Sequence, residues 1–143
     1  MNGTVNVRIF NRAVSDTTGN RSLVQSEGEG ATTSHLPYEH ELTAGQRTAV
    51  VQSLTLDELL ASDRLAPPQV LKIDIEGHAA AALRGARKLL ADNRPAMLIS
   101  MHSPEEAEGV RAEIQPLGYR PRSLDGAQID WPATLFHTAI FTA

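Results

Sequence analysis

Two apolar runs separated by an alanine-rich segment constrain the fold of this chain more than any other feature. The first run, Val70 to Ile75, is rich in β-branched residues and fits a strand buried on both faces. Residues 79–91 then carry apolar side chains at helical spacing, and a second apolar run spans residues 96–101. Strand, helix and strand over this length form a βαβ unit, so we expect two parallel neighbouring strands.

Three residues with ionisable side chains follow these two strands. Asp74 and Glu76 end the first strand, and His102 follows the second. The carboxyl ends of parallel strands meet at one edge, where ligands of open α/β sheets bind, so we expect the three side chains to share a rim. A carboxylate that ends a buried strand is costly without a purpose, which favours a binding role for Asp74.

Glu76 and His102 each have an alternative interpretation, and two further residues nearby are expected to have no catalytic role. Glu76 fits equally well as an acid that complements the dipole of the following helix. His102 fits equally well as the neighbour of a helix cap at Ser103. We expect His78 at the surface, and we expect Lys72 to pair with a carboxylate or extend into solvent.

Composition limits the class of protein. With 143 residues, we treat residues 1–143 as one domain with a single core. The net charge of -4 argues against nucleic acid or an anionic membrane as the main partner. No apolar stretch reaches spanning length and no signal-like segment is evident, so we expect a cytoplasmic protein without a membrane partner. Cysteine is absent, which excludes disulfides and thiolate sites.

The remaining segments complete an α/β pattern. We expect strands at residues 5–9, 22–26, 49–53, 119–123 and 135–142, with residues 22–26 and 49–53 forming a hairpin. We expect helices at residues 54–61, capped by Thr55, and from Ser103 to Gly118. The polar segment 27–48 is either a mobile loop over a site or disordered. This order predicts the later part of a doubly wound sheet, without a glycine-rich nucleotide fingerprint.

Several collinear blocks carry a family resemblance. They are Asn11–Asp16 followed by Gly19, Leu54–Leu60, Val70–His78, Leu83–Ala86, Arg94-Pro95 and Gly118-Tyr119. Together they resemble the FkbM family of S-adenosylmethionine-dependent methyltransferases, over about Val5 to Tyr119. The resemblance implies a Rossmann-like methyltransferase sheet, mostly parallel, with an antiparallel hairpin at the C-terminal end.

The resemblance also implies a reaction and its residues. It implies O-methylation of a hydroxyl on a small molecule or sugar, with S-adenosylmethionine as cofactor. His102 is then the candidate base, while Asp74 and Glu76 orient the imidazole, hold the acceptor or favour the sulfonium charge. Asp74 also stands as a cofactor ligand. Asn11, Ala13 and Asp16 would border the adenine, although a plain strand-to-turn exit explains them as well.

Two departures from the family pattern lead to further expectations. Ala79 replaces an acid that commonly follows the strand-end glycine, and the family's opening motifs are missing, so we expect a sheet lacking its first two strands. Such a sheet would expose the edge of the strand that begins at Val70. We therefore expect either a homodimer through that edge or marginal stability.

The sequence leaves other interpretations of the protein and of its site open. A catalytically inactive remnant, or an interaction module, would keep the same sheet. A divalent ion bound by Asp74, Glu76 and His102 ranks second for the site, behind a metal-free site. A metal-dependent hydrolase would use the same three residues.

Overall fold

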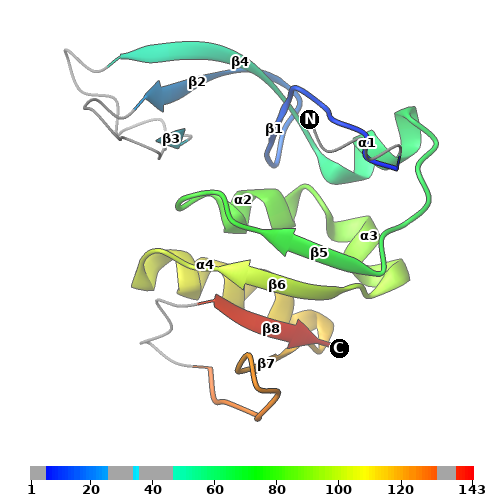
Figure 1. The fold of residues 1–143 in the computed structure, drawn as a ribbon, viewed down its shortest axis with the longest axis vertical. Coiled ribbons are helices and arrows are strands. Elements are labelled where there is room, and N and C mark those ends of the chain that lie inside the picture. The colour runs from blue at the N-terminus through cyan, green and yellow to red at the C-terminus, as the bar shows by residue number, and fades with distance from the viewer. Residues whose placement is uncertain (1–5, 26–33, 36–46, 132–137) are drawn as a thin grey trace.

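The computed structural model describes residues 6–25, 34–35, 47–131 and 138–143, which form two four-stranded sheets and the helices around them (Figure 1). The first sheet has the spatial order β1 (Ala13–Val14), β4 (Thr48–Leu54), β2 (Gly19–Gln25) and β3 (Ser34–His35). The second has the order β5 (Val70–Ile73), β6 (Ala96–Ser100), β8 (Thr138–Thr142) and β7 (Arg120–Arg122). The helices are α1 (Leu56–Ser62), α2 (Ala79–Arg84), α3 (Arg87–Asn93), α4 (Pro104–Ile114) and the 3₁₀ helix η1 (Gln115–Leu117).

The predicted βαβ unit is confirmed in its pairing. β5 and β6 are parallel neighbours, with Ile73 opposite Ile99, and α2 and α3 connect them. The predicted hairpin between β2 and β4 is confirmed as an antiparallel pair. β7 and β8 form the expected C-terminal antiparallel pair, with the proline-containing strand β7 at the edge.

The expectation of one mostly parallel sheet is wrong for the described residues. Their strands divide between two sheets, and the parallel pairs among them are β1 with β4 and β5 with β6. The pairs β2–β3, β2–β4, β6–β8 and β7–β8 are antiparallel. The chain is therefore a mixed α/β protein with limited parallel pairing.

The strand predicted at residues 5–9 does not form in residues 6–9. These residues have no strand partner, and Ile9 is 89% exposed. The apolar alternation is present, but a strand also needs a neighbour for its backbone groups. The parallel pairing with β4 begins only at Ala13.

The predicted helix at residues 79–91 is divided into α2 and α3 at Gly85. The backbone N–H of Asp57 donates to the Gly85 carbonyl, and the Asp57 carboxylate accepts from the N–H groups of Lys88 and Leu89. A side chain from α1 therefore caps a new helix start after Gly85. The predicted caps at Thr55 and Ser103 are confirmed, each accepting from the N–H three residues later.

The core lies between the second sheet and helices α2, α3 and α4. Burial alternates along β6, where Met97 and Ile99 are buried and their neighbours are partly exposed. The buried Tyr119 side chain closes the core and donates its hydroxyl to the Pro95 carbonyl. This core holds the ends of β5 and β6 in fixed register.

Strand β5 differs from the expected doubly buried strand. Val70 is 67% exposed and Lys72 is also exposed, whereas Leu71 is partly buried and Ile73 is buried, so one face of β5 is covered and the other is open to solvent. Among the described strands β5 pairs with β6 alone. Most of the polar segment 27–48 and residues 135–137 of the predicted last strand lie outside the described residues. None of the helices within the described ranges is both long and apolar enough to cross a lipid bilayer.

Candidate active-site rim

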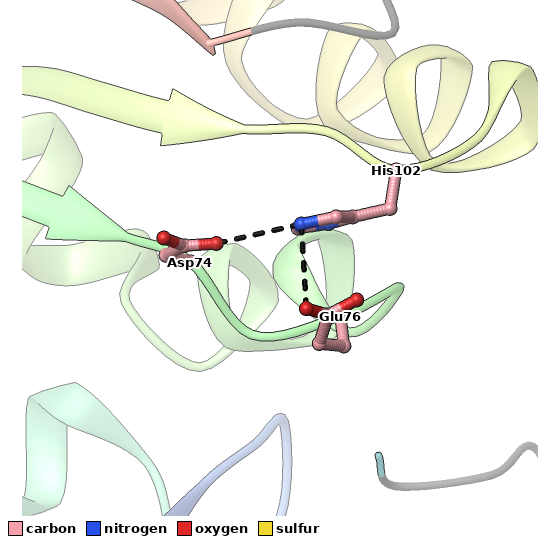
Figure 2. A group of neighbouring side chains, drawn as sticks. All are labelled: Asp74, Glu76 and His102. Atoms are coloured by element: carbon pink, nitrogen blue, oxygen red, sulfur yellow. Dashed lines mark ion pairs between the residues drawn. The ribbon is translucent and has the colours of Figure 1, made fainter. Parts of the chain in front are cut away.

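Asp74, Glu76 and His102 meet where β5 and β6 end, as the strand order predicted. His102 Nε2 lies 3.4 Å from Asp74 Oδ1 and 3.7 Å from Glu76 Oε1. Figure 2 shows the three side chains pointing toward one another, two from the β5–α2 connection and one from the β6–α4 connection. These three residues are called the rim below.

The backbone between β5 and α2 turns sharply at Glu76. Glu76 has φ +42° and Gly77 has φ +84°, so two consecutive residues adopt left-handed conformations. The His78 N–H donates to the Ile75 carbonyl and closes the turn. A left-handed conformation is uncommon for a residue with a side chain, and Arg64 and Arg94 also adopt it in this chain. This turn brings the Glu76 carboxylate back toward Asp74 and His102.

The rim carries excess negative charge. Lys72 Nζ lies 2.8 Å from Asp74 Oδ2, which confirms the expected pairing of Lys72 with a carboxylate. The hydrogen bond from Lys72 lowers the pKa of Asp74, which is therefore ionised at neutral pH. Lys72 balances the charge of Asp74, whereas the Glu76 carboxylate has no such balance within the rim. The rim therefore favours a cation or a hydrogen-bond donor.

Glu106 is a residue of the site that the sequence indicated only as part of a helix cap. Its side chain is 1% exposed, and its Oε2 accepts a hydrogen bond from the His102 N–H at 2.8 Å and lies 3.3 Å from His102 Nδ1. The available signal was its position four residues after His102 in the first turn of α4. At that spacing a side chain reaches back to the residue before the cap.

Ala13 lies in β1, with Asn11 before this strand and Asp16 after it. Asn11 and Ala13 line an open hollow on the first sheet, together with Val50 and other residues of β2 and β4. Among the described hydrogen bonds and ion pairs, none joins Asn11, Ala13 or Asp16 to the rim. The structure therefore brings together the three residues of the rim but not the proposed adenine contacts.

Asp16 has structural partners of its own. It forms ion pairs with Arg21 at 2.8 Å and with Arg84 at 3.3 Å. Partial burial favours the neutral acid, but hydrogen bonds from Arg84 and Ser15 outweigh it and lower the pKa of Asp16. Asp16 thus links the segment before β2 to α2, and this contact explains its ionised state without a ligand.

The expectation that His78 lies at the surface is wrong. His78 is 4% exposed, and its Nε2 shares a 3.0 Å hydrogen bond with Ser15 Oγ. Burial lowers the pKa of His78, so the ring is neutral at neutral pH. Ser15, the residue after β1, makes a long-range side-chain contact with this ring that the helical position of His78 does not indicate.

The rim has the donor set for two kinds of chemistry. An imidazole nitrogen facing carboxylates is suited to accept a proton from a bound hydroxyl. One ligand atom from each of Asp74, Glu76 and His102 also lies within 4.8 Å of the others, a spacing compatible with a divalent ion.

Comparisons with known proteins identify the family. Residues 3–121 match the sequence profile described as the Methyltransferase FkbM domain. No curated protein matches the chain significantly. No solved structure does so either. Because the match covers more than half of the 143 residues and includes the whole rim, the chain belongs to the FkbM methyltransferase domain family.

Proposed function

We propose that the chain is an S-adenosylmethionine-dependent methyltransferase that methylates a hydroxyl group of a small molecule or sugar. The observation that carries the proposal is the meeting of His102 Nε2 with two carboxylates at the ends of parallel strands, in a chain of a methyltransferase family. We also propose that β5 and β6 belong to a Rossmann-like sheet and that α2 belongs to the helical connection between them. Ligands of such sheets bind beyond the carboxyl ends of the strands.

The charge of the rim supports a cofactor with a cationic centre. The Asp74 and Glu76 side chains are 41% and 36% exposed, so a ligand can approach both. S-adenosylmethionine carries a sulfonium charge and supplies an electrophilic methyl group when bound. Asp74, whose pKa the Lys72 hydrogen bond lowers, is ionised beside that lysine, and the Glu76 carboxylate supplies the negative charge that Lys72 does not balance. Asn11 and Ala13 are proposed to border the adenine from the first sheet, with Asp16 beside them.

His102 is the proposed base. Neutral imidazole accepts the proton of the acceptor hydroxyl at Nε2. The new Nε2–H group points back toward the acceptor oxygen, and the Asp74 and Glu76 oxygens, 3.4 and 3.7 Å from Nε2, stabilise the positive charge of the imidazolium. The partly exposed carboxylates of Asp74 and Glu76 are suited to accept hydrogen bonds from further hydroxyls of a polyhydroxylated acceptor.

Titration calorimetry with S-adenosylmethionine tests cofactor binding. We expect Asp74→Asn to weaken binding about tenfold, because the variant removes one charge facing the sulfonium. Asp92→Asn is the matched control, since Asp92 also pairs with a lysine but lies in α3, before the opposite end of β6. If the wild-type chain shows no binding, the proposal fails and the inactive remnant or interaction module becomes the better interpretation.

Methyl transfer tests the role of His102. Transfer of a labelled methyl group to a panel of monosaccharides and polyols identifies the acceptor class. We expect His102→Ala to bind the cofactor normally and to lose about 100-fold or more in rate. A variant that retains its rate excludes His102 as the base.

A divalent ion at the rim is the second candidate, favoured by the ligand spacing within 4.8 Å. Asp74, Glu76 and His102 would then hold the ion and leave positions open for water or a hydroxyl. Manganese or magnesium should raise the melting temperature of the wild-type chain and not that of Glu76→Gln. Metal stabilisation without any response to S-adenosylmethionine would indicate a metal-dependent hydrolase instead.

A further inference from the structure

Glu106 is a buried carboxylate whose contacts converge on the rim. Its Oε1 accepts from the Ala79 N–H at 3.1 Å, and its Oε2 accepts from the His102 N–H at 2.8 Å. His102 Nδ1 lies 3.3 Å from the same Oε2. Burying a carboxylate is costly, and donors from two separate segments offset that cost here.

Helix capping alone does not account for these contacts. In a capping box the carboxylate accepts from the N–H of the cap residue itself. Glu106 instead binds the N–H of His102, one residue before the Ser103 cap, and that of Ala79, the first residue of α2. The carboxylate thus joins the segment that carries His102 to the turn that carries Asp74 and Glu76.

Carboxylate oxygens face both nitrogens of the His102 ring, and each favours the ring hydrogen on the nitrogen that it faces. An oxygen of Glu106 faces Nδ1 at 3.3 Å, whereas oxygens of Asp74 and Glu76 face Nε2 at 3.4 and 3.7 Å. Water screens the partly exposed acids, and Lys72 already neutralises Asp74. The Glu106 carboxylate is buried, and so its attraction for an N–H group is the least screened. The hydrogen of the neutral ring therefore belongs on Nδ1.

We infer that Glu106 is the positioning residue of His102: it holds the neutral ring in the Nδ1–H tautomer and leaves Nε2 as the proton-accepting atom. This inference rests on the proposed function for its catalytic meaning, but the tautomer is a property of the free chain. A carboxylate that fixes one ring nitrogen and directs the other is the arrangement required of an oriented base.

Nitrogen-15 NMR of the His102 ring tests the tautomer without any ligand. His102→Gln assigns the signals, and spectra are taken at a pH at which the ring is neutral. A hydrogen bond to a charged group shifts such an equilibrium about tenfold or more, so we expect the Nδ1–H tautomer to be the major form in the wild-type chain. A predominantly Nε2–H ring would overturn the inference, whatever the variants do.

Glu106→Gln tests the cause. The amide keeps the shape but loses the charge, and we expect the Nδ1–H fraction to fall to about half or less. Glu105→Gln is the matched control, because Glu105 occupies the same helical turn and is exposed. An unchanged tautomer in Glu106→Gln would overturn the inference.

Ser103→Ala separates positioning from stability. This variant removes the hydroxyl that accepts from the Glu106 N–H and leaves the carboxylate in place. We expect it to lower the melting temperature by about 3 °C and to leave the tautomer unchanged. A tautomer that changes in Ser103→Ala as much as in Glu106→Gln would assign the effect to the helix start. Loss of cofactor binding with an intact tautomer would reject the proposed function and not this role.

Discussion

The buried ring of His78 makes the stability of the fold depend on pH. Burial is the main cause of its lowered pKa, relative to an ordinary value of 6.5. The charged groups that act on the ring are Arg21 and Arg84, which lower the pKa, and Asp16 and Glu106, which raise it. Below pH 6.5 the unfolded chain binds a proton at His78 that the folded chain excludes. Stability therefore falls as the pH falls from 6.5 toward the folded pKa.

His78→Gln removes this proton-linked term and keeps a polar group that can reach Ser15 Oγ. We expect its urea-unfolding free energy to depend less on pH than that of the wild-type chain between pH 5 and 7. Other groups titrate in both proteins, so the difference between the two slopes isolates His78. Parallel slopes for the two proteins would contradict this assignment.

At the scale of residues, the sequence predicted that the rim residues meet, but it did not predict the burial of His78. Asp74, Glu76 and His102 follow strands that the sequence marks clearly, and the geometry of parallel strands then places them together. The burial of His78 depends on Ser15, 63 residues earlier in the chain. No local pattern encodes such a contact.

At the scale of elements, Gly85 sets the distance between α2 and the segment after β1. A Cβ atom at this position would lie 2.1 Å from the Ser15 carbonyl oxygen, which belongs to the backbone and cannot rotate away. We expect Gly85→Ala to lower the free energy of unfolding by about 2–3 kcal/mol, measured by urea denaturation. Gly85 has φ −75°, so the cost comes from the contact and not from backbone strain.

Gly109 in α4 offers the matched comparison. A Cβ there would lie 2.9 Å from the Ala80 Cβ, a side-chain atom on a neighbouring helix. The Ala80 Cβ is fixed to its backbone, so α2 or α4 must shift slightly, but the overlap is smaller than at Gly85 and a gain in helix propensity of about 1 kcal/mol offsets part of the cost. We therefore expect Gly109→Ala to lower the free energy of unfolding by less than Gly85→Ala does. Equal effects of the two substitutions would show that Gly85 has no special packing role.

The elements show where sequence patterns are sufficient. The helix starts at Thr55 and Ser103 were predicted because a cap acts within three residues. The division between α2 and α3 was missed because its cause is Asp57, a capping residue from another helix. The apolar alternation at residues 5–9 also predicted a strand, but strand formation depends on a partner that is distant in sequence.

At the scale of the whole molecule, the same limit explains the error in sheet topology. The patterns located β2, β4, β5, β6, β7 and β8 near their observed positions. They did not indicate that these strands divide between two sheets with mostly antiparallel pairs. Pairing direction depends on the path of the whole chain, whereas burial patterns report only which face of a strand is covered.

The open edge of β5 is proposed to pair with a second copy of the chain. Among the described strands β5 pairs with β6 alone, and its Val70 is 67% exposed. Unpaired edges of this kind attract further strands. Lys72 and Asp74 both follow Val70 at alternating positions, so an antiparallel copy can place Lys72 opposite the partner's Asp74.

Analytical ultracentrifugation over a range of protein concentrations measures this association. We expect a dimer for the wild-type chain and a dissociation constant at least about tenfold higher for Val70→Lys, because a charge at the edge opposes pairing. Val50→Lys is the control, since Val50 is 75% exposed but lies on β4, an internal strand of the other sheet. The Val50→Lys variant should form the dimer as the wild-type chain does. A wild-type chain that remains monomeric at every concentration would exclude the β5 edge as a self-association surface.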